Sequence, residues 1–63
     1  MPVVHIHLVK GRSIEKKREL AEKVTSAVTE TIGVVRDTVE VLLHECEVEN
    51  VAKGGILFAD SRK

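Results

Sequence analysis

Residues 3–17 read VVHIHLVKGRSIEKK, and this stretch predicts where a strand ends and a helix begins. Apolar side chains occupy alternate positions within residues 3–9, a period of two that is typical of a β-strand. Gly11 breaks this pattern, and Ser13 is a residue type that caps the N-termini of helices. The sequence therefore predicts a strand over residues 3–9 and a helix that begins at residue 14.

The predicted helix extends to Ile32, because apolar residues recur at helical spacing along one side of it. Glu15 lies in the first turn, where a negative charge suits the helix dipole, and Glu19 precedes Lys23 by four residues, a favourable pair. Gly33 is expected to end the helix in the left-handed conformation. The apolar stripe consists of Ile14, Leu20, Ala21, Val24, Ala27, Val28 and Ile32.

A second strand is predicted from Thr38 to about Glu45, with apolar residues on both of its faces, as in a strand that is covered on both sides. A strand, a long helix and a strand form one βαβ unit whose strands pair in parallel. We therefore expect an α/β (α+β) fold in which residues 1–63 form a single domain.

The C-terminal part of the chain has a different character. Residues 47–50 are expected to form a loop, residues 54–55 (Gly-Gly) a turn, and residues 56–59 a short strand. Residues 60–63 are polar and are expected to fray. The sequence thus predicts a C-terminal β-hairpin or arm, which can reach a neighbouring subunit.

The chain is too short to bury a large core by itself. It has 63 residues, 43% of them hydrophobic, and a single cysteine, Cys46, which excludes an internal disulfide. A two-stranded sheet with one helix leaves its far face bare. We therefore expect a homo-oligomer in which other copies complete the fold.

The charge pattern excludes several classes of partner. Ten basic and ten acidic residues give a formal net charge of zero and are interspersed, which argues against nucleic acid or an anionic membrane. No apolar stretch approaches the length of a membrane span, and no secretion signal is expected. With a lone thiol, these features predict a cytoplasmic protein.

The second residue, Pro2, is the main candidate for chemistry. Removal of Met1, which is usual before a small residue, leaves Pro2 with a free secondary amine. Such an amine can act as a base if its surroundings disfavour the charged form. If Met1 is retained, the Pro2 nitrogen is an amide and cannot be a base. The alternative interpretation of Pro2 is structural: it is a proline in an edge strand, where this residue type is tolerated.

Pro2, the Gly-Arg-Ser sequence at 11–13 before a helix, and Gly33 together resemble the small-subunit members of the 4-oxalocrotonate tautomerase family. The resemblance covers essentially the whole chain up to Gly55. It implies a homo-oligomer, a hexamer built as a trimer of dimers, and an enzyme that needs no cofactor. The implied reaction is the interconversion of 2-hydroxymuconate-type dienols with their 2-oxo isomers, or the enolisation of another 2-oxo acid such as phenylpyruvate.

The resemblance also implies roles for particular residues. Pro2 would be the catalytic base, and Arg12 would bind the distal carboxylate of the substrate, usually from a neighbouring subunit. A guanidinium suits that task, because it can hold a carboxylate with two hydrogen bonds.

Two positions depart from the family pattern. Glu40 stands where the family has a second substrate-binding arginine, and Val51 stands where it has an aromatic residue. A carboxylate at position 40 would repel an anionic substrate and favour a protonated proline amine. Arg36 could replace the missing cation if it turns inward. Glu40 could itself act as a catalytic acid or base, but we expect it instead to form an ion pair between subunits, with Arg12, Arg36 or a lysine.

Other motifs have simpler interpretations. His5, His7 and His44 could suggest a metal site, but three histidines without further ligands are more typical of a surface or interface, and no metal is expected. Cys46 has no motif of a nucleophile around it. The Gly54-Gly55 pair lacks the sequence of a phosphate-binding loop.

Two further hypotheses compete with the tautomerase. Hydration or dehalogenation of an unsaturated acid would need a water-activating carboxylate in the C-terminal loop, where this chain has Lys53. Alternatively, the chain is a non-catalytic or regulatory subunit of a hetero-oligomer. Glu40 and Val51 would then mark a site that has lost its activity.

Overall fold

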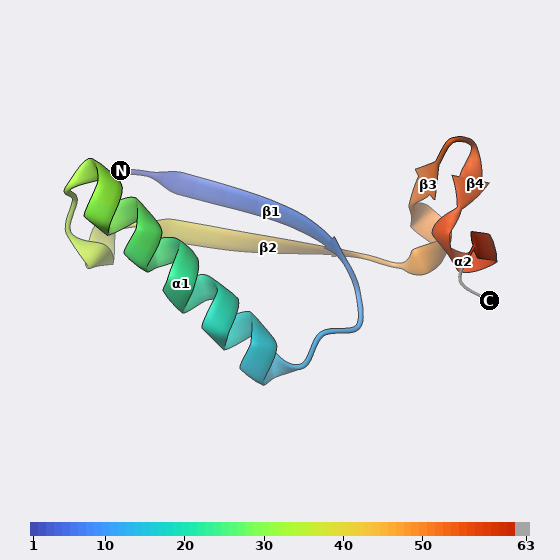
Figure 1. Ribbon diagram of the computed structural model, residues 1–63, viewed down its shortest axis with the longest axis horizontal. Helices are drawn as coiled ribbons and strands as arrows, with labels where there is room; N and C mark the ends of the chain where they lie inside the picture. Colours follow the sequence, from blue (N-terminus) through green and yellow to red (C-terminus); the bar gives the residue numbers. More distant parts are fainter. Residues whose placement is uncertain (62–63) are drawn as a thin grey trace.

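The computed structural model describes residues 1–61, and these form a two-stranded sheet, one long helix against it and a small C-terminal arm (Figure 1). The expected fraying at residues 62–63 lies outside the described residues. The elements, in chain order, are β1 (Val3–Val9), α1 (Ile14–Ile32), the 3₁₀-helix η1 (Arg36–Thr38), β2 (Glu40–Cys46), the 3₁₀-helix η2 (Val48–Asn50), β3 (Ala52–Lys53), β4 (Ile56–Leu57) and α2 (Phe58–Ser61).

Strands β1 and β2 pair in parallel, with Val3 opposite Glu40 and Val9 opposite Cys46. This confirms the βαβ unit. The second strand begins two residues later than the sequence pattern predicts, since Thr38 belongs to η1. The Thr38 hydroxyl donates a hydrogen bond to the Val35 carbonyl at 2.7 Å, and such local bonds from threonine compete with strand formation.

Helix α1 has the ends that its sequence predicts. The Ser13 hydroxyl accepts a hydrogen bond from the Lys16 backbone N–H at 3.3 Å. At the other end Gly33 has φ 82°, and its N–H donates to the Thr29 carbonyl at 2.9 Å. The predicted Glu19–Lys23 ion pair is also present, at 2.9 Å.

Replacing Gly33 by alanine is expected to lower the free energy of unfolding by about 1–2 kcal/mol, because a Cβ is unfavourable at this positive φ. Urea unfolding measures the effect. Thr31→Ala, an exposed change near the end of the same helix, is the control and should alter stability by less than about 0.5 kcal/mol. Equal values for the two variants would show that the cap is unimportant.

The sheet has one face toward α1 and one face away from it. Residues paired across parallel strands share a face, and the half-buried positions of β1 are Val4, Ile6 and Leu8, followed by Val9 at the strand end. Lys17 of α1 forms an ion pair with Glu45 of β2 at 2.7 Å, which places Glu45 on the helix side. We call the opposite side the open face; it carries Val3, His5, His7, Val9, Glu40, Leu42, His44 and Cys46.

None of the residues 1–61 is buried in the single chain. Its accessible surface is 4913 Å², whereas a folded monomer of this mass exposes only about 4,000 Å². The radius of gyration is 14.8 Å, against about 11 Å for a compact chain of this length. The chain by itself therefore lacks a core, in agreement with a fold that is completed by partner subunits.

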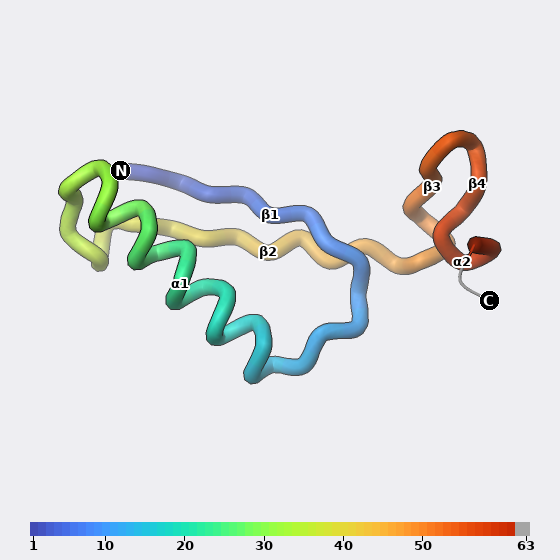
Figure 2. Tube along the Cα trace, viewed as in Figure 1, coloured from blue at the N-terminus to red at the C-terminus, as the bar shows by residue number. Residues whose placement is uncertain are grey.

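The C-terminal arm lies beyond the end of the sheet (Figure 2). The predicted hairpin is present: β3 and β4 are antiparallel and are joined by Gly54 and Gly55 at φ 60° and 83°. Two details of the prediction are wrong, because residues 48–50 form η2 and Phe58 starts a helical turn instead of continuing β4. The Phe58 N–H still donates to the Val51 carbonyl at 2.7 Å.

The chain forms the helical turn α2 directly after β4 because the pairing of β4 cannot continue along the arm. Val51 directly follows η2, so a continued β4 would have to pair with the residues of that 3₁₀-helix, which are not extended. The Ser61 hydroxyl instead donates to the Phe58 carbonyl at 3.2 Å, a bond that favours a local turn. Within residues 1–61, no helix has both the length and the apolar composition needed to span a bilayer.

Candidate active site

Pro2 lies at the start of β1, at the end of the sheet where the chain begins (Figure 1). Its carbonyl accepts a hydrogen bond from the Glu40 N–H at 3.0 Å, and the residue is half-buried. Met1, in contrast, is 85% exposed. Removal of Met1 would therefore free the Pro2 nitrogen with little loss of packing.

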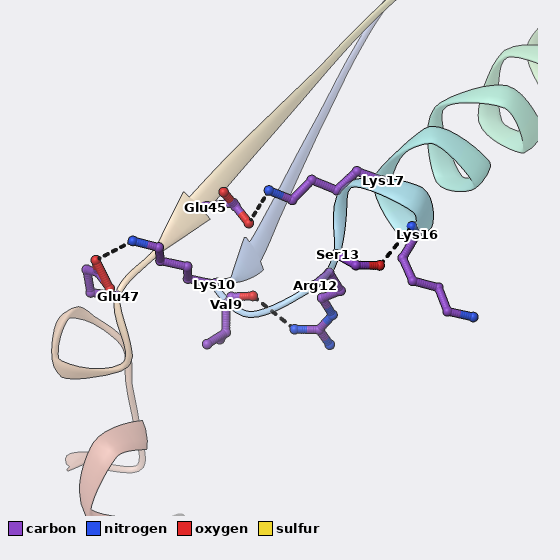
Figure 3. Close-up of polar contacts among 8 residues, drawn as sticks. All are labelled: Val9, Lys10, Arg12, Ser13, Lys16, Lys17, Glu45 and Glu47. Carbon is purple, nitrogen blue, oxygen red and sulfur yellow. Dashed lines mark hydrogen bonds and ion pairs between the residues drawn. The ribbon is translucent and has the colours of Figure 1, made fainter.

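Arg12 lies in the loop between β1 and α1. Its Nη1 donates to the Val9 carbonyl at 2.9 Å, so the side chain turns back under the end of β1 (Figure 3). Together with Leu8, Val9 and Phe58 it lines a hollow of about 300 Å³. A guanidinium has five N–H donors, and the one bond to Val9 leaves it the capacity to bind a carboxylate.

Two basic side chains near Arg12 have acidic partners. Lys10 pairs with Glu47 at 3.2 Å, and Lys17 pairs with Glu45 at 2.7 Å (Figure 3). Both carboxylates come from β2 or the residue that follows it. Arg12 is the charged side chain that lines the hollow, and no ion pair joins it to a carboxylate within residues 1–61.

Pro2 and Arg12 lie at opposite ends of β1 (Figure 1). The strand has seven residues between them, and at about 3.3 Å per residue it separates the two groups by roughly 20 Å. The Arg12 side chain does not shorten this distance, since it is held at Val9. One chain thus cannot bring both residues to one small molecule.

Glu40 begins β2 directly opposite Val3 and is exposed. Its predicted ion pair lies between subunits, and within the described part of a single chain Glu40 has no ion pair.

Arg36 lies at the same end of the sheet but is turned toward α1. Its guanidinium bonds Glu22 at 2.6 Å and the Ser26 hydroxyl at 3.0 Å. Both partners of this ion pair are about half exposed, so it contributes only about 0–1 kcal/mol and can be exchanged.

Val51 lies near the Arg12 end of the sheet. With His7, Leu8, Val9 and Cys46 it lines a second, largely apolar hollow of about 210 Å³. The structure adds Phe58 to the candidate residues, because this side chain lines the Arg12 hollow. Sequence reasoning missed Phe58, although its being the chain's one aromatic residue was a possible signal. Phe58 thus places an aromatic ring beside Arg12, in a different hollow from the one that Val51 lines.

Of the remaining candidates, His7 and Cys46 line the hollow beside Val51. His5, His7 and His44 stack on the open face, and no cluster of three metal-ligating side chains occurs among residues 1–61. Lys53 is exposed in the β3–β4 hairpin, and Cys46 is a free, half-buried thiol.

Comparison with known proteins shows the family of this chain. A family model described as "Tautomerase enzyme" matches residues 2–61. The chain belongs to the tautomerase family. A "Probable tautomerase" of Bacillus cereus is 40% identical over 60 residues, which cover 95% of this chain and 98% of the relative. The "2-hydroxymuconate tautomerase" of Bacillus subtilis is 38% identical over 95% of this chain and 97% of its own length.

The fold of this tautomerase matches solved structures of the same family. A heterohexameric 4-oxalocrotonate tautomerase from Chloroflexus aurantiacus superimposes with a TM-score of 0.92, at 31% identity, over 98% of this chain and 100% of that one. The expected family, the βαβ fold with C-terminal strands and the class of enzyme, an isomerase, are therefore confirmed. The individual roles of Pro2 and Arg12 stay predictions.

Proposed function

We propose that this tautomerase moves a proton between oxygen and carbon of a small enolisable 2-oxo acid, with Pro2 as the general base. The favoured substrate is a 2-hydroxydienoate such as 2-hydroxymuconate, and phenylpyruvate represents the wider class. The Bacillus subtilis relative carries the name of this reaction. The placement of Pro2, half-buried behind an exposed Met1, supports its use as a base once Met1 is removed.

The proposed reaction balances without a cofactor. The neutral secondary amine of Pro2 takes the proton of the 2-hydroxyl group, and the oxygen electrons form the carbonyl. The double bond shifts along the conjugated system, and the protonated proline returns the proton at carbon. Arg12 binds the distal carboxylate and stabilises the negative charge that develops along the acid.

The distance between Pro2 and Arg12 is our reason to propose that several copies of this chain assemble. Since roughly 20 Å of strand lies between them, a working site takes Pro2 from one copy and Arg12 from another. We infer a homo-oligomer, with a hexamer built as a trimer of dimers as the expected form, in which residues 1–63 are one domain. The heterohexameric relative from Chloroflexus aurantiacus is a precedent for six small subunits.

A mixing experiment tests the shared site. Pro2→Ala and Arg12→Ala subunits, each nearly inactive alone, are unfolded together and refolded at equal concentration. After random assembly about a quarter of all sites hold both native residues, so about a quarter of the native activity should return. Mixing the two proteins without unfolding is the control. If activity stays at the level of the single variants although native mass spectrometry shows mixed oligomers, Pro2 and Arg12 do not act in one shared site.

A regulatory subunit is the second candidate, and Glu40 favours it. A carboxylate beside the Pro2 backbone repels an anionic substrate, and a heteromeric relative exists. Expression of the chain alone separates the candidates: a homo-oligomer that ketonises 2-hydroxymuconate excludes a purely regulatory role.

A further inference from the structure

Phe58 lies beside Arg12, although the two residues are far apart in the sequence. Together with Leu8 and Val9 they line the hollow of about 300 Å³. Phe58 is half-buried in the single chain, and it is the one phenylalanine of a sequence without tyrosine or tryptophan. A hollow of this size is at the lower end of the range for small-molecule sites, roughly 300–1,000 Å³. Three apolar residues and one cation suit a small carboxylic acid with an apolar chain.

Hydrogen bonds hold both Phe58 and Arg12 in place. The Phe58 N–H donates to the Val51 carbonyl at 2.7 Å, which ties the start of α2 to the residue that follows η2. The Phe58 carbonyl accepts a hydrogen bond from the Ser61 hydroxyl at 3.2 Å. Arg12, in turn, is held by its bond to the Val9 carbonyl at 2.9 Å (Figure 3). The backbone of Phe58 and the guanidinium of Arg12 are therefore positioned before a ligand binds, which lowers the cost of binding.

An aromatic ring at this place affects a bound acid in two ways. It takes the place of water next to the guanidinium, and a bond between a carboxylate and a guanidinium is stronger in less polar surroundings. Its flat face also makes closer contact with a flat, conjugated carbon chain than with a puckered, saturated one. The first effect acts on any carboxylic acid, whereas the second distinguishes acids by the shape of their chains.

We propose that Phe58 is a specificity-determining residue of this tautomerase, and that its ring favours acids in which a flat, conjugated chain carries the carboxylate that Arg12 binds. The favoured ligands are thus unsaturated diacids, and saturated diacids of the same length bind more weakly. This inference rests on the proposed function for the binding of a carboxylate by Arg12. It does not depend on Pro2 as the base, because it concerns binding and not proton transfer.

The experiment compares two inert diacids of equal length and charge. The flat, conjugated probe is trans,trans-muconate, and adipate is its saturated counterpart; neither has the 2-hydroxyl or 2-oxo group that the reaction needs. Calorimetric titration gives the dissociation constant of each diacid for the assembled wild type and for Phe58→Ala. The ratio of the two constants, adipate over muconate, should fall about three- to tenfold when the ring is removed, the usual value of a contact between two flat π systems.

Two further variants separate the flat ring from other effects. Phe58→Leu keeps an apolar side chain and should therefore keep the fold, but leucine is not flat, so the ratio should fall as it does in Phe58→Ala. Ile56→Ala is the matched control, because it truncates an apolar side chain of the same arm that does not line the hollow. It should leave the ratio unchanged. An equal fall in Ile56→Ala would show that the packing of the arm, and not the ring, sets the preference.

An unchanged ratio in Phe58→Ala and Phe58→Leu would overturn the proposal, as would a wild type that binds both diacids equally or binds neither. The rigid diene of muconate loses less freedom on binding than adipate does, so the decisive quantity is the change in the ratio between proteins. Failure of the proposed function gives a different result. The protein then does not ketonise 2-hydroxymuconate, or it does so without Pro2, whatever the ratio of the two dissociation constants.

Discussion

Replacing Pro2 by alanine is expected to lower kcat for 2-hydroxymuconate about 100-fold or more, the usual contribution of a positioned general base. Alanine also permits removal of Met1 and leaves a primary amine at the chain start. The amine of Pro2 differs because its ring fixes the backbone angle and hence the direction of the lone pair. The loss should therefore appear mainly in kcat, and KM should change little.

The measurement needs the intact mass of both proteins, because the mechanism requires that Met1 is absent. Circular dichroism and native mass spectrometry check that Pro2→Ala has the fold and assembly of the wild type. With the wild type, kcat/KM should rise with pH through one ionisation, as the base must be unprotonated. Wild-type protein that retains Met1 and remains fully active would exclude the Pro2 nitrogen as the base.

The secondary structure follows closely from the sequence because its signals are local. The alternation in residues 3–9, the Ser13 cap and the left-handed Gly33 all act within a few residues, and each appears where predicted. The errors also have local causes. Thr38 bonds back to Val35 and delays β2, and a continued β4 would have to pair with η2, which is not extended.

The site could be predicted only in part, because its geometry depends on contacts between distant residues. The sequence marks Pro2 and Arg12, but the extent of β1 shows that they lie too far apart to meet within one chain. The sequence also leaves open where Arg36 points, and in the structure it bonds to Glu22 and Ser26 of α1. No pattern in the sequence places Phe58 beside Arg12, since that contact arises from the fold of the arm.

The expected effect of replacing Arg12 by alanine is a rise in KM of roughly 10- to 100-fold, the value of a charge-assisted hydrogen bond pair to a carboxylate. A smaller loss in kcat should accompany it, because the same charge stabilises the transition state. Arg12→Lys should recover only part of the affinity, since lysine keeps the charge but cannot form two parallel bonds. Steady-state kinetics with 2-hydroxymuconate give these values.

Two controls separate substrate binding from a structural effect of Arg12, whose bond to the Val9 carbonyl also holds the loop. Arg18→Ala removes an arginine from the exposed side of α1 and should leave KM unchanged. The second control is a 2-hydroxydienoate that lacks the distal carboxylate. If Arg12 binds that carboxylate, Arg12→Ala should bind this substrate almost as well as the wild type does. The substrate has no distal carboxylate for Arg12 to bind, so the loss of Arg12 removes no contact. An equal loss for both substrates would instead show that Arg12 acts by shaping the loop, and the assignment of carboxylate binding would be wrong.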